Sequence, residues 1–533
     1  MRKAFFILFI LTSLPLFSQT VIQRNRLDAN NISSHFWNTG VFNQNTISGN
    51  TAGFEWPKGS GKTAMFTAGL TMAAIINGQF AQVSASYRGE YSPGKMQNNT
   101  AYSDETFKLY KVSAGDNNSN PDYANWGLMV PNGAPYVDVN NNGAFDSGID
   151  IPGVKDAKQT IFICMTDGFA SERISGEGFG GGVASPLLGC EVHMTAWAYS
   201  TSPYLNDCQF IKYQIINKSN NVWDRTFFTF FVDPDLGNGD DDYIGCDVSQ
   251  NLGYGYNATN NDLVYGTAPP AVGFLLLKGA AIKSGSQTTE LGMTSFTNYE
   301  YSIPAYSCLI GNVTYSYNLM RGLKSDSSQW INPQTMQPTK YVFSGDPETG
   351  TGWNDGSNVI TNCGGSLTGS SINYSAGNRN FILSTGSNAL KVLPGEKQTI
   401  VLSQLIAQGT NNKNSVTRLK GYAEAVQKFY NENISTSISY EPNAIPDKFS
   451  LSQNYPNPFN PATTIDVNIS SAVDTKLRVY DVNGKEVAIL INGFLQPGSY
   501  KVSFNGANLP SGVYFYKLEI KDASVVKKMI LMK

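Results

Sequence analysis

The chain has 533 residues, with 38 Lys and Arg against 41 Asp and Glu, which gives a net charge of −3. This charge is too small for a protein that binds nucleic acid by neutralising phosphates. With two histidines, the chain lacks the imidazoles for a multi-histidine zinc or iron site. Only 15% of the residues are charged and 12% are aromatic, and there are 51 Gly and 24 Pro. This composition excludes disorder and coiled coil and favours many short strands joined by turns.

The first 18 residues have the pattern of a signal peptide. Arg2 and Lys3 precede an apolar run from Ala4 to Leu11, and Ser18 provides a small residue for cleavage. The alternative is a membrane anchor, but the run is well short of the roughly 20 residues that a helix needs to cross a bilayer. We therefore predict a signal peptide over residues 1–18 and an exported mature chain without a transmembrane segment.

Residues 19–443 are predicted to form a large β-rich body. Alternating or clustered Val, Ile, Phe and Tyr mark the strands, and turn-forming residues lie between them. Examples are Thr160–Cys164, Phe210–Ile215, Phe227–Val232 and Gln398–Ile406. The predicted fold class is therefore all-β, built mainly of antiparallel β-sandwiches. Two prolines and a polar stretch mark a weak break near residues 270–300, which would divide the body into two subdomains.

One segment near residues 415–431 has helical rather than strand spacing. Val416, Leu419, Ala423 and Val426 recur every three or four residues, and Ser415 stands where an N-cap is expected. We predict one amphipathic helix there, packed on the sheet that contains the strand before it.

Six cysteines, at positions 164, 190, 208, 246, 308 and 363, form no CxxC pair. This spacing argues against zinc ribbons and thioredoxin-like motifs. An exported chain permits disulfides, whereas a chain of this size also folds with buried free thiols. The sequence leaves both alternatives open.

The strongest chemical pattern is an Asp- and Asn-rich loop over residues 138–150. Oxygen-bearing side chains occupy its first, third, fifth and ninth positions and glycine its sixth, as in loops that wrap Ca²⁺. The predicted calcium ligands are Asp138, Asn140, Asn142, the Ala144 carbonyl, Asp146 and Asp150. Asp150 falls one place after the usual closing carboxylate. The alternative is an Asx-rich turn without metal.

A second acidic cluster places six carboxylates within fifteen residues, directly after an apolar strand. Such carboxylates repel one another unless they are solvated or bridged by a cation. The predicted calcium ligands are Asp233, Asp235, Asp240, Asp242 and Asp247. A solvated acidic loop is the alternative.

Cys190, Glu191 and His193 bring a thiol, a carboxylate and an imidazole together within four residues. In a strand, Glu191 and His193 lie on one face and Cys190 on the other, which argues against a thiol nucleophile beside its base. We interpret His193 as a satisfied, half-buried histidine. No catalytic residue and no residue that binds an organic cofactor is assigned.

A polar, proline-containing linker over residues 434–448 leads to a final domain at residues 444–533. Its short strands, including Thr464–Ile469 and Gly512–Ile520, alternate with turns such as Asp481–Gly484. This spacing predicts a small immunoglobulin-like β-sandwich.

The final domain carries motifs of a known family. Phe449–Pro461, Leu477–Val487, Leu509–Tyr516 and the terminal Lys527–Lys533 strongly resemble the type A C-terminal sorting domain of the type IX secretion system. In that family the domain is an address that the outer-membrane translocon reads. The resemblance therefore implies export to the surface of a Gram-negative bacterium or into the medium, and surface lipopolysaccharide as one anchor.

The body also resembles parts of large secreted proteins that carry the same tail. The similar stretches are Phe54–Thr63, Tyr136–Pro152, Asp233–Asn238 and Gly245–Asp247. Those relatives contribute no activity, so the resemblance supports location and metal rather than chemistry. We expect a non-enzymatic adhesive or structural protein with calcium-stabilised loops that meets lipopolysaccharide or extracellular glycan. The alternative is a secreted carboxylate-based hydrolase of glycan or peptide, with two acids facing each other across a deep, aromatic-lined groove.

Overall fold

The structure is a computed structural model and describes residues 22–46, 51–140, 142–173, 185–284, 287–299, 313–361, 371–434, 439–441, 449–471, 473–495, 498–507, 509–521 and 523–533. The predicted signal peptide at residues 1–18 lies outside these ranges. So do Cys308 and Cys363.

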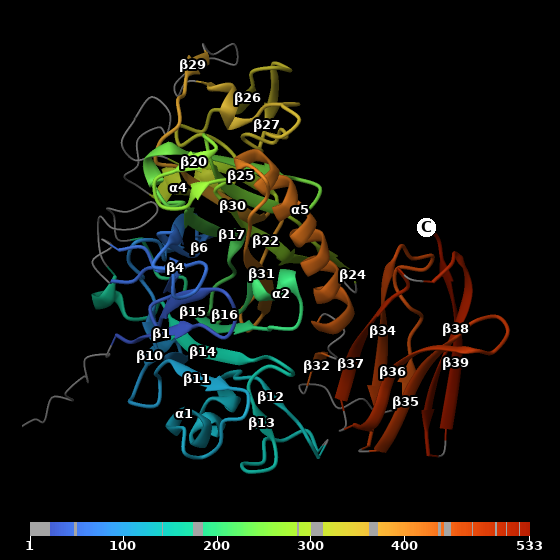
Figure 1. Ribbon diagram of the computed structural model, residues 1–533. Coiled ribbons are helices and arrows are strands. Elements are labelled where there is room, and N and C mark those ends of the chain that lie inside the picture. Colours follow the sequence, from blue (N-terminus) through green and yellow to red (C-terminus); the bar gives the residue numbers. More distant parts are fainter. Residues whose placement is uncertain are drawn as a thin grey trace, which may run out of the picture.

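The body contains two large antiparallel sheets (Figure 1). The first is ten-stranded, in the order β25 (Ser295–Tyr299), β30 (Asn380–Gly386), β17 (Asp224–Asp233), β6 (Thr67–Ile76), β3 (Val41–Phe42), β2 (Ser33–Trp37), β4 (Phe54–Glu55) and β5 (Thr63–Met65), with β1 (Arg24–Leu27) on β2 and β7 (Gln79–Val83) on β6. The second is nine-stranded, in the order β11 (Tyr110–Ser113), β14 (Gln159–Thr166), β15 (Cys190–Ala198), β16 (Cys208–Asn217), β31 (Lys397–Ala407), β22 (Ala271–Lys278), β19 (Leu252–Asn257) and β18 (Asp242–Asp247), with β8 (Ser92–Pro93) on β14.

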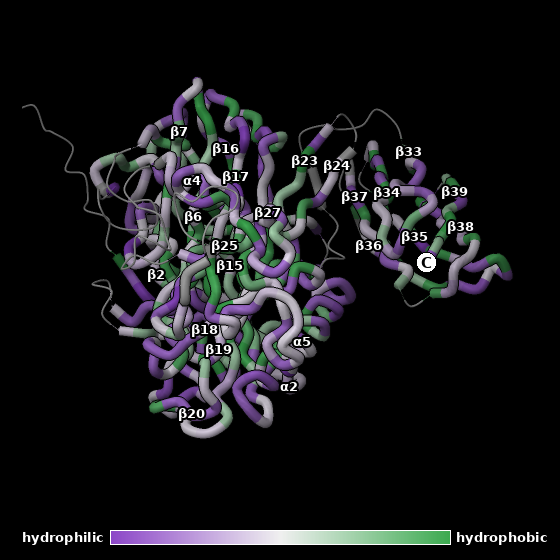
Figure 2. Tube along the Cα trace, turned by 90° about the horizontal axis from the view of Figure 1, so that it is seen from above, coloured by the Kyte–Doolittle hydropathy of each residue, from purple (hydrophilic) through white to green (hydrophobic). Residues whose placement is uncertain are grey.

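The main core lies between these two sheets. Phe228 and Phe230 of β17 share one buried cluster with Ile211 and Tyr213 of β16, and the rings of Tyr213 and Phe230 are 5.8 Å apart. Side chains alternate between the faces of a strand, so such contacts define a sandwich. The all-β prediction is confirmed, and green, hydrophobic stretches run along strands such as β15 (Figure 2).

Both outer faces of the sandwich are also covered. Phe227 and Phe231 of β17 point away from the main core and pack with helix α4 (Val313–Met320), which the sequence did not predict. Strands that are buried on both faces have nearly continuous apolar sequences, as residues 227–232 do.

Strands from both sides of residues 270–300 belong to the same two sheets, so the sheets continue across the predicted weak break.

The predicted amphipathic helix is α5 (Asn412–Phe429), which covers the outer face of the nine-stranded sheet (Figure 1). It begins three residues before the predicted start. Its N-cap is Asn411 and not Ser415, because the Asn411 side chain accepts a hydrogen bond from the Asn414 N–H. Ser415 instead lies inside the first turn, where its hydroxyl donates to the Pro269 carbonyl at 2.7 Å.

Shorter elements connect the strands of the body. The hairpins are β9 (Lys95–Gln97) with β10 (Thr100–Tyr102), β12 (Tyr136–Val137) with β13 (Ile151–Pro152), β20 (Asn261–Asp262) with β21 (Gly266–Thr267), β23 (Ala281–Ser284) with β24 (Gln287–Glu290), β26 (Trp330–Asn332) with β27 (Gln337–Thr339), and β28 (Val359–Thr361) with β29 (Ser371–Asn373). The short helices are α1 (Pro121–Ala124), α2 (Pro203–Asn206) and the 3-10 turns η1 (Trp126–Leu128), η2 (Val130–Asn132), η3 (Ala170–Glu172), η4 (Gly239–Asp241) and η5 (Asp355–Ser357), and the π-turn η6 (Tyr430–Ile434) follows α5.

The C-terminal domain is a second, smaller sandwich of two four-stranded sheets. One contains β32 (Ser439–Glu441), β37 (Gly498–Asn505), β34 (Ala462–Ile469) and β33 (Ser450–Leu451), and the other β36 (Glu486–Leu495), β35 (Val473–Tyr480), β38 (Gly512–Ile520) and β39 (Ala523–Leu531). The domain has its own buried core, which includes Ile465, Leu477 and Tyr516. The immunoglobulin-like topology stays a prediction. Residues 439–441 of the predicted linker add an edge strand to this domain.

Four cysteines of the described chain are free and buried: Cys164, Cys190, Cys208 and Cys246. For these four, the buried-thiol alternative holds.

Candidate metal centres

The predicted calcium loop closes a hairpin. Strands β12 and β13 pair Tyr136 with Pro152 and Val137 with Ile151, so residues 138–150 form the loop between them. The Asp138 carboxylate accepts hydrogen bonds from the N–H groups of Asn142 at 3.2 Å and Gly143 at 2.7 Å. Gly143 has a φ of +79°, a left-handed conformation that favours glycine and makes the sharp turn.

The polar side chains of this loop contact one another. The amides of Asn140 and Asn142 both donate to Asp146 Oδ2, and these bonds lower the pKa of the Asp146 carboxyl. Asp150 is 1% exposed, and its two oxygens accept from the Val139 and Asp146 N–H groups at 2.8 and 2.7 Å. The structure thus brings Asp138, Asn140, Asn142, Asp146 and Asp150 into one network. Ala144 joins it through its N–H, which donates to Asn142 Oδ1 at 2.8 Å.

The second acidic cluster is largely buried. Asp233 ends β17, Asp235 follows it, and Asp242 begins β18, which places the three carboxylates where two sheets meet a loop. Asp233 is 2% exposed and Asp242 is 1% exposed. Tyr87 Oη donates to Asp233 Oδ2 at 2.8 Å, and the Leu236 N–H donates to Asp242 Oδ2 at 2.9 Å.

One oxygen of each of the Asp233, Asp235 and Asp242 carboxylates lacks a hydrogen-bond partner. Oδ1 of Asp233, Oδ1 of Asp235 and Oδ1 of Asp242 are buried without a hydrogen-bond partner. Burial raises the pKa of each carboxyl, and the negative charges of neighbouring aspartates add to the effect. A hydrogen bond between the Asp233 and Asp235 carboxyls raises the pKa of Asp233 further and opposes the rise at Asp235, so these two oxygens lack a donor only when both carboxyls are ionised. Burying a charged group without a partner costs free energy, so such a cluster takes up either protons or a cation.

Two of the predicted ligands do not join this buried group. Asp240 is solvent-exposed in η4, although its charge acts on Asp235. Asp247 is at the other end of β18, five residues or roughly 17 Å from Asp242, and it bonds to Lys420 at 3.3 Å. The structure therefore does not bring Asp247 together with Asp233, Asp235 and Asp242, because β18 separates it from them.

Asp262 also lies near this cluster, although the sequence pattern did not predict it. It is 2% exposed, and its carboxylate accepts from the N–H groups of Asn238, Val264 and Tyr265. Its charge raises the pKa of Asp242. The turn-forming run Asn260–Asp262 before an apolar pair was the signal available, but nothing local linked it to residues 233–242.

Asp247 and Asp346 are two acids that share one surface depression. They line a depression of about 470 Å³ whose lining contains no aromatic residue. Lys420 Nζ lies 3.3 Å from Asp247 and 3.0 Å from Asp346. Burial alone would raise the pKa of both carboxyls, but hydrogen bonds and Lys420 hold them below the ordinary value. A general acid needs the opposite shift, so this pair is an ion-pair cluster rather than an acid and its base.

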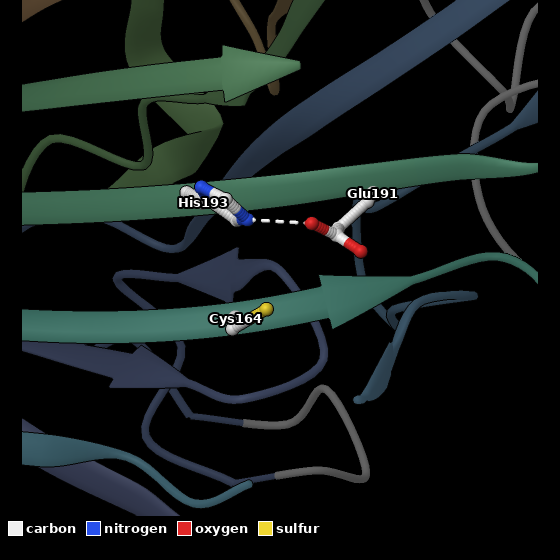
Figure 3. A group of neighbouring side chains, drawn as sticks. All are labelled: Cys164, Glu191 and His193. Atoms are coloured by element: carbon white, nitrogen blue, oxygen red, sulfur yellow. Dashed lines mark hydrogen bonds and ion pairs between the residues drawn. The ribbon is translucent and has the colours of Figure 1, made fainter. Parts of the chain in front are cut away.

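A third site combines two strands. His193 and Glu191 lie on one face of β15, and His193 Nε2 is 2.9 Å from Glu191 Oε1 (Figure 3). Cys164 of β14 is the direct cross-strand partner of His193. The ligand atoms of Cys164, Glu191 and His193 all lie within 4.8 Å of one another, and among the described residues this is the one group of three or more His, Cys, Asp or Glu that meets this spacing.

This arrangement agrees with the alternation predicted for residues 190–193 and extends it. Cys190 lies in the main core on the opposite face, as expected. His193 is 6% exposed and is thus buried rather than half-buried. The thiol on the same face as Glu191 and His193 is that of Cys164 and not that of Cys190. The sequence did not predict it, because local sequence does not determine which residues of two strands pair.

The electrostatics of this third site follow from burial. Burial raises the pKa of the Cys164 thiol well above its ordinary value, and the Glu191 charge raises it further. Burial alone would raise the pKa of Glu191 as well, but its contacts with His193 and Lys218 hold it below the ordinary value. The Cys164 thiol donates to the Gly94 carbonyl at 3.3 Å, and the Met96 N–H donates to Glu191 Oε2 at 3.0 Å.

The fold defines a two-part protein, with a large sandwich body and a small sandwich at the C-terminus. Residues 453–532 match the family model described as the secretion system C-terminal sorting domain. The chain therefore carries a type IX sorting domain, and it is exported to the cell surface or secreted. The sorting machinery of this system handles it. None of the described helices has the length and apolar character needed to cross a membrane.

The other comparisons define no activity. No curated protein sequence matches the chain. A solved polysaccharide lyase shares 8% identity over 64% of this chain, with a TM-score of 0.17. The match spans 34%, about a third, of the lyase chain.

Proposed function

We propose that the body is a non-enzymatic adhesive or structural module whose loops are held rigid by calcium outside the cell. The observation that carries this proposal is the set of three buried, unpartnered carboxylate oxygens on Asp233, Asp235 and Asp242. Ca²⁺ prefers six to eight hard oxygen ligands and accepts water among them. Among the described residues only Cys164, Glu191 and His193 form a group of three whose ligand atoms all lie within 4.8 Å of one another, so calcium would have to draw the three aspartate oxygens closer together. They would then supply the protein part of the shell, and water would complete it.

The hairpin loop 138–150 is the second proposed calcium site. Its side-chain oxygens belong to one network centred on Asp146, and calcium would draw the Asn140 and Asn142 amide oxygens inward. Both Asp150 oxygens accept hydrogen bonds from backbone N–H groups of the loop, so Asp150 positions the loop rather than binding the ion directly. Two rigid loops on a β-sandwich suit a module that presents a fixed surface to lipopolysaccharide or extracellular glycan.

Calcium binding is tested by thermal unfolding of the exported chain. A site of about 10⁻⁴–10⁻³ M affinity fills in the calcium-rich exterior. At roughly 10–100 times Kd, binding to the folded state adds about 1.4–2.7 kcal/mol, which raises Tm by about 1–3 °C in a protein of this size. We expect 10 mM CaCl₂ to raise Tm, EDTA to remove the gain, and MgCl₂ to give less.

Single variants separate the two sites. Asp233→Asn removes a buried charge at constant shape, so it should stabilise the calcium-free protein and shrink the calcium response. Asp138→Ala should shrink the response through the hairpin loop alone. Glu105→Gln changes an exposed carboxylate outside both sites and is the control. A calcium titration that leaves Tm unchanged and releases no heat would remove calcium from the proposal.

A further inference from the structure

We infer that Cys164, Glu191 and His193 form a binding site for a borderline-soft divalent cation of the zinc class. This inference is independent of the proposed calcium sites, which offer hard oxygen ligands alone. A thiolate, an imidazole and a carboxylate together are a donor set typical of Zn²⁺, and three protein ligands leave one position for a further ligand.

The pairing of β14 and β15 brings the three donors together. Glu191 and His193 are two residues apart on β15 and so share a face, and Cys164 is directly opposite His193 on β14. Their ligand atoms lie within 4.8 Å of one another. Tetrahedral zinc with bonds of about 2.0–2.3 Å needs its ligand atoms roughly 3.4–3.6 Å apart. The three side chains, drawn in Figure 3, therefore lie within reach of one ion.

Neighbouring backbone groups restrict the positions of Glu191 and His193. The Met96 N–H holds the second Glu191 oxygen at 3.0 Å, which leaves Oε1 toward His193. Gly133 packs against the imidazole so closely that a Cβ there would lie 2.3 Å from His193 Nδ1. Gly133 has a φ of +92°, which glycine adopts freely. Fixed ligands of this kind raise metal affinity, because little freedom is lost on binding.

The site is closed to bulk water, and the positive charges of Lys95 and Lys218 both act on Cys164. Cys164 is 1% exposed, Glu191 4% and His193 6%. Lys218 Nζ lies 3.7 Å from Glu191 Oε1 and is partly exposed. Zinc binding releases the Cys164 thiol proton to solvent and requires the His193 proton on Nδ1, so that Nε2 offers its lone pair to the ion. The resulting thiolate, with the Glu191 carboxylate, balances the two charges of the ion. The Lys218 ammonium opposes the incoming cation.

Cobalt binding to the purified exported chain is the first test. Co²⁺ replaces Zn²⁺ and gives a thiolate-to-metal charge-transfer band when a cysteine ligates it. We expect one equivalent of Co²⁺ to give this band, and Zn²⁺ to abolish it. Cys164→Ala should lose the band, whereas the matched Cys190→Ala, on the opposite face of β15, should keep it. A folded wild-type chain without the band, or a Cys164→Ala chain that retains it, would overturn the inference.

Two further variants keep the test decisive if Cys164→Ala fails to fold. Glu191→Gln should weaken Zn²⁺ binding by roughly tenfold or more, because a neutral amide replaces the carboxylate ligand. Lys218→Ala should tighten it by roughly two- to tenfold, because an opposing charge is removed. A purely structural Glu191–His193 hydrogen bond predicts no such pair of changes. Equal zinc affinity in both variants and the wild type would contradict the site, while Asp233→Asn should leave the cobalt band intact.

Discussion

At the scale of single residues, His35 is a buried imidazole held neutral by its neighbours. It is 6% exposed in β2, and the Arg26 Nε–H donates to His35 Nε2 at 3.1 Å. Burial lowers the pKa of His35 from 6.5 to about 4, and the charges of Arg26 and Arg24 contribute. The folded state therefore binds a proton on this residue less readily than the unfolded state does.

This shift predicts acid sensitivity. The stabilisation from neutral His35 is fully present above pH 6.5 and is lost as the pH falls from 6.5 toward 4. We expect the free energy of unfolding to fall by about 1–3 kcal/mol from this residue alone between pH 7.5 and 4.5. In His35→Gln, whose amide oxygen still accepts from Arg26, this part of the slope should vanish. Urea unfolding at both pH values measures it, and equal slopes in variant and wild type would contradict the assignment.

At the scale of elements, the apolar face of α5 packs against the nine-stranded sheet. Leu419 is fully buried, and it shares a cluster with Leu405 of β31 and Val416 of the same helix. Gly273 of β22 lies under it, since a Cβ there would be 3.0 Å from a Leu419 methyl. Leu419→Ala should therefore leave a cavity and cost about 2–5 kcal/mol. The exposed Lys413→Ala on the same helix should cost less than about 0.5 kcal/mol by urea unfolding. Similar losses in both variants would show that the helix does not depend on this contact.

The same scale shows what local sequence determines. The apolar run of residues 227–232 and the helical periodicity near residues 415–431 were sufficient to predict both elements, because burial pattern and geometry agree there. The candidate sites differ in how far local sequence could predict them. Residues 138–150 contact one another within one hairpin, so the sequence grouped them correctly. Asp262, Asp247 and Cys164 depended on which strands pair, and a one-residue change of register would have moved Cys164 to the other face.

At the scale of the whole molecule, the body and the sorting domain have separate cores. The described residues of the body's clusters all precede residue 435, and the C-terminal cluster begins at Phe449. Between them, β32 pairs with β37 of the sorting domain, for example Tyr440 with Tyr500. The peptide between the cores therefore adds its strand to the sorting domain and not to the body.

The separate cores predict the effect of deleting the sorting domain. Deletion of residues 449–533 takes away the whole C-terminal core but no member of the body's clusters, so the body should fold with a Tm within about 2 °C of its value in the full chain. The same deletion removes the segment that matches the sorting-domain family, residues 453–532. We therefore expect the truncated chain to accumulate inside the cell envelope while the full chain reaches the surface or the medium. Fractionation of cells that make each chain, with a thermal melt of the recovered body, checks both halves. Truncated protein in the medium at the full-chain level would refute the role of the tail, because a folded body would then leave the cell without its address.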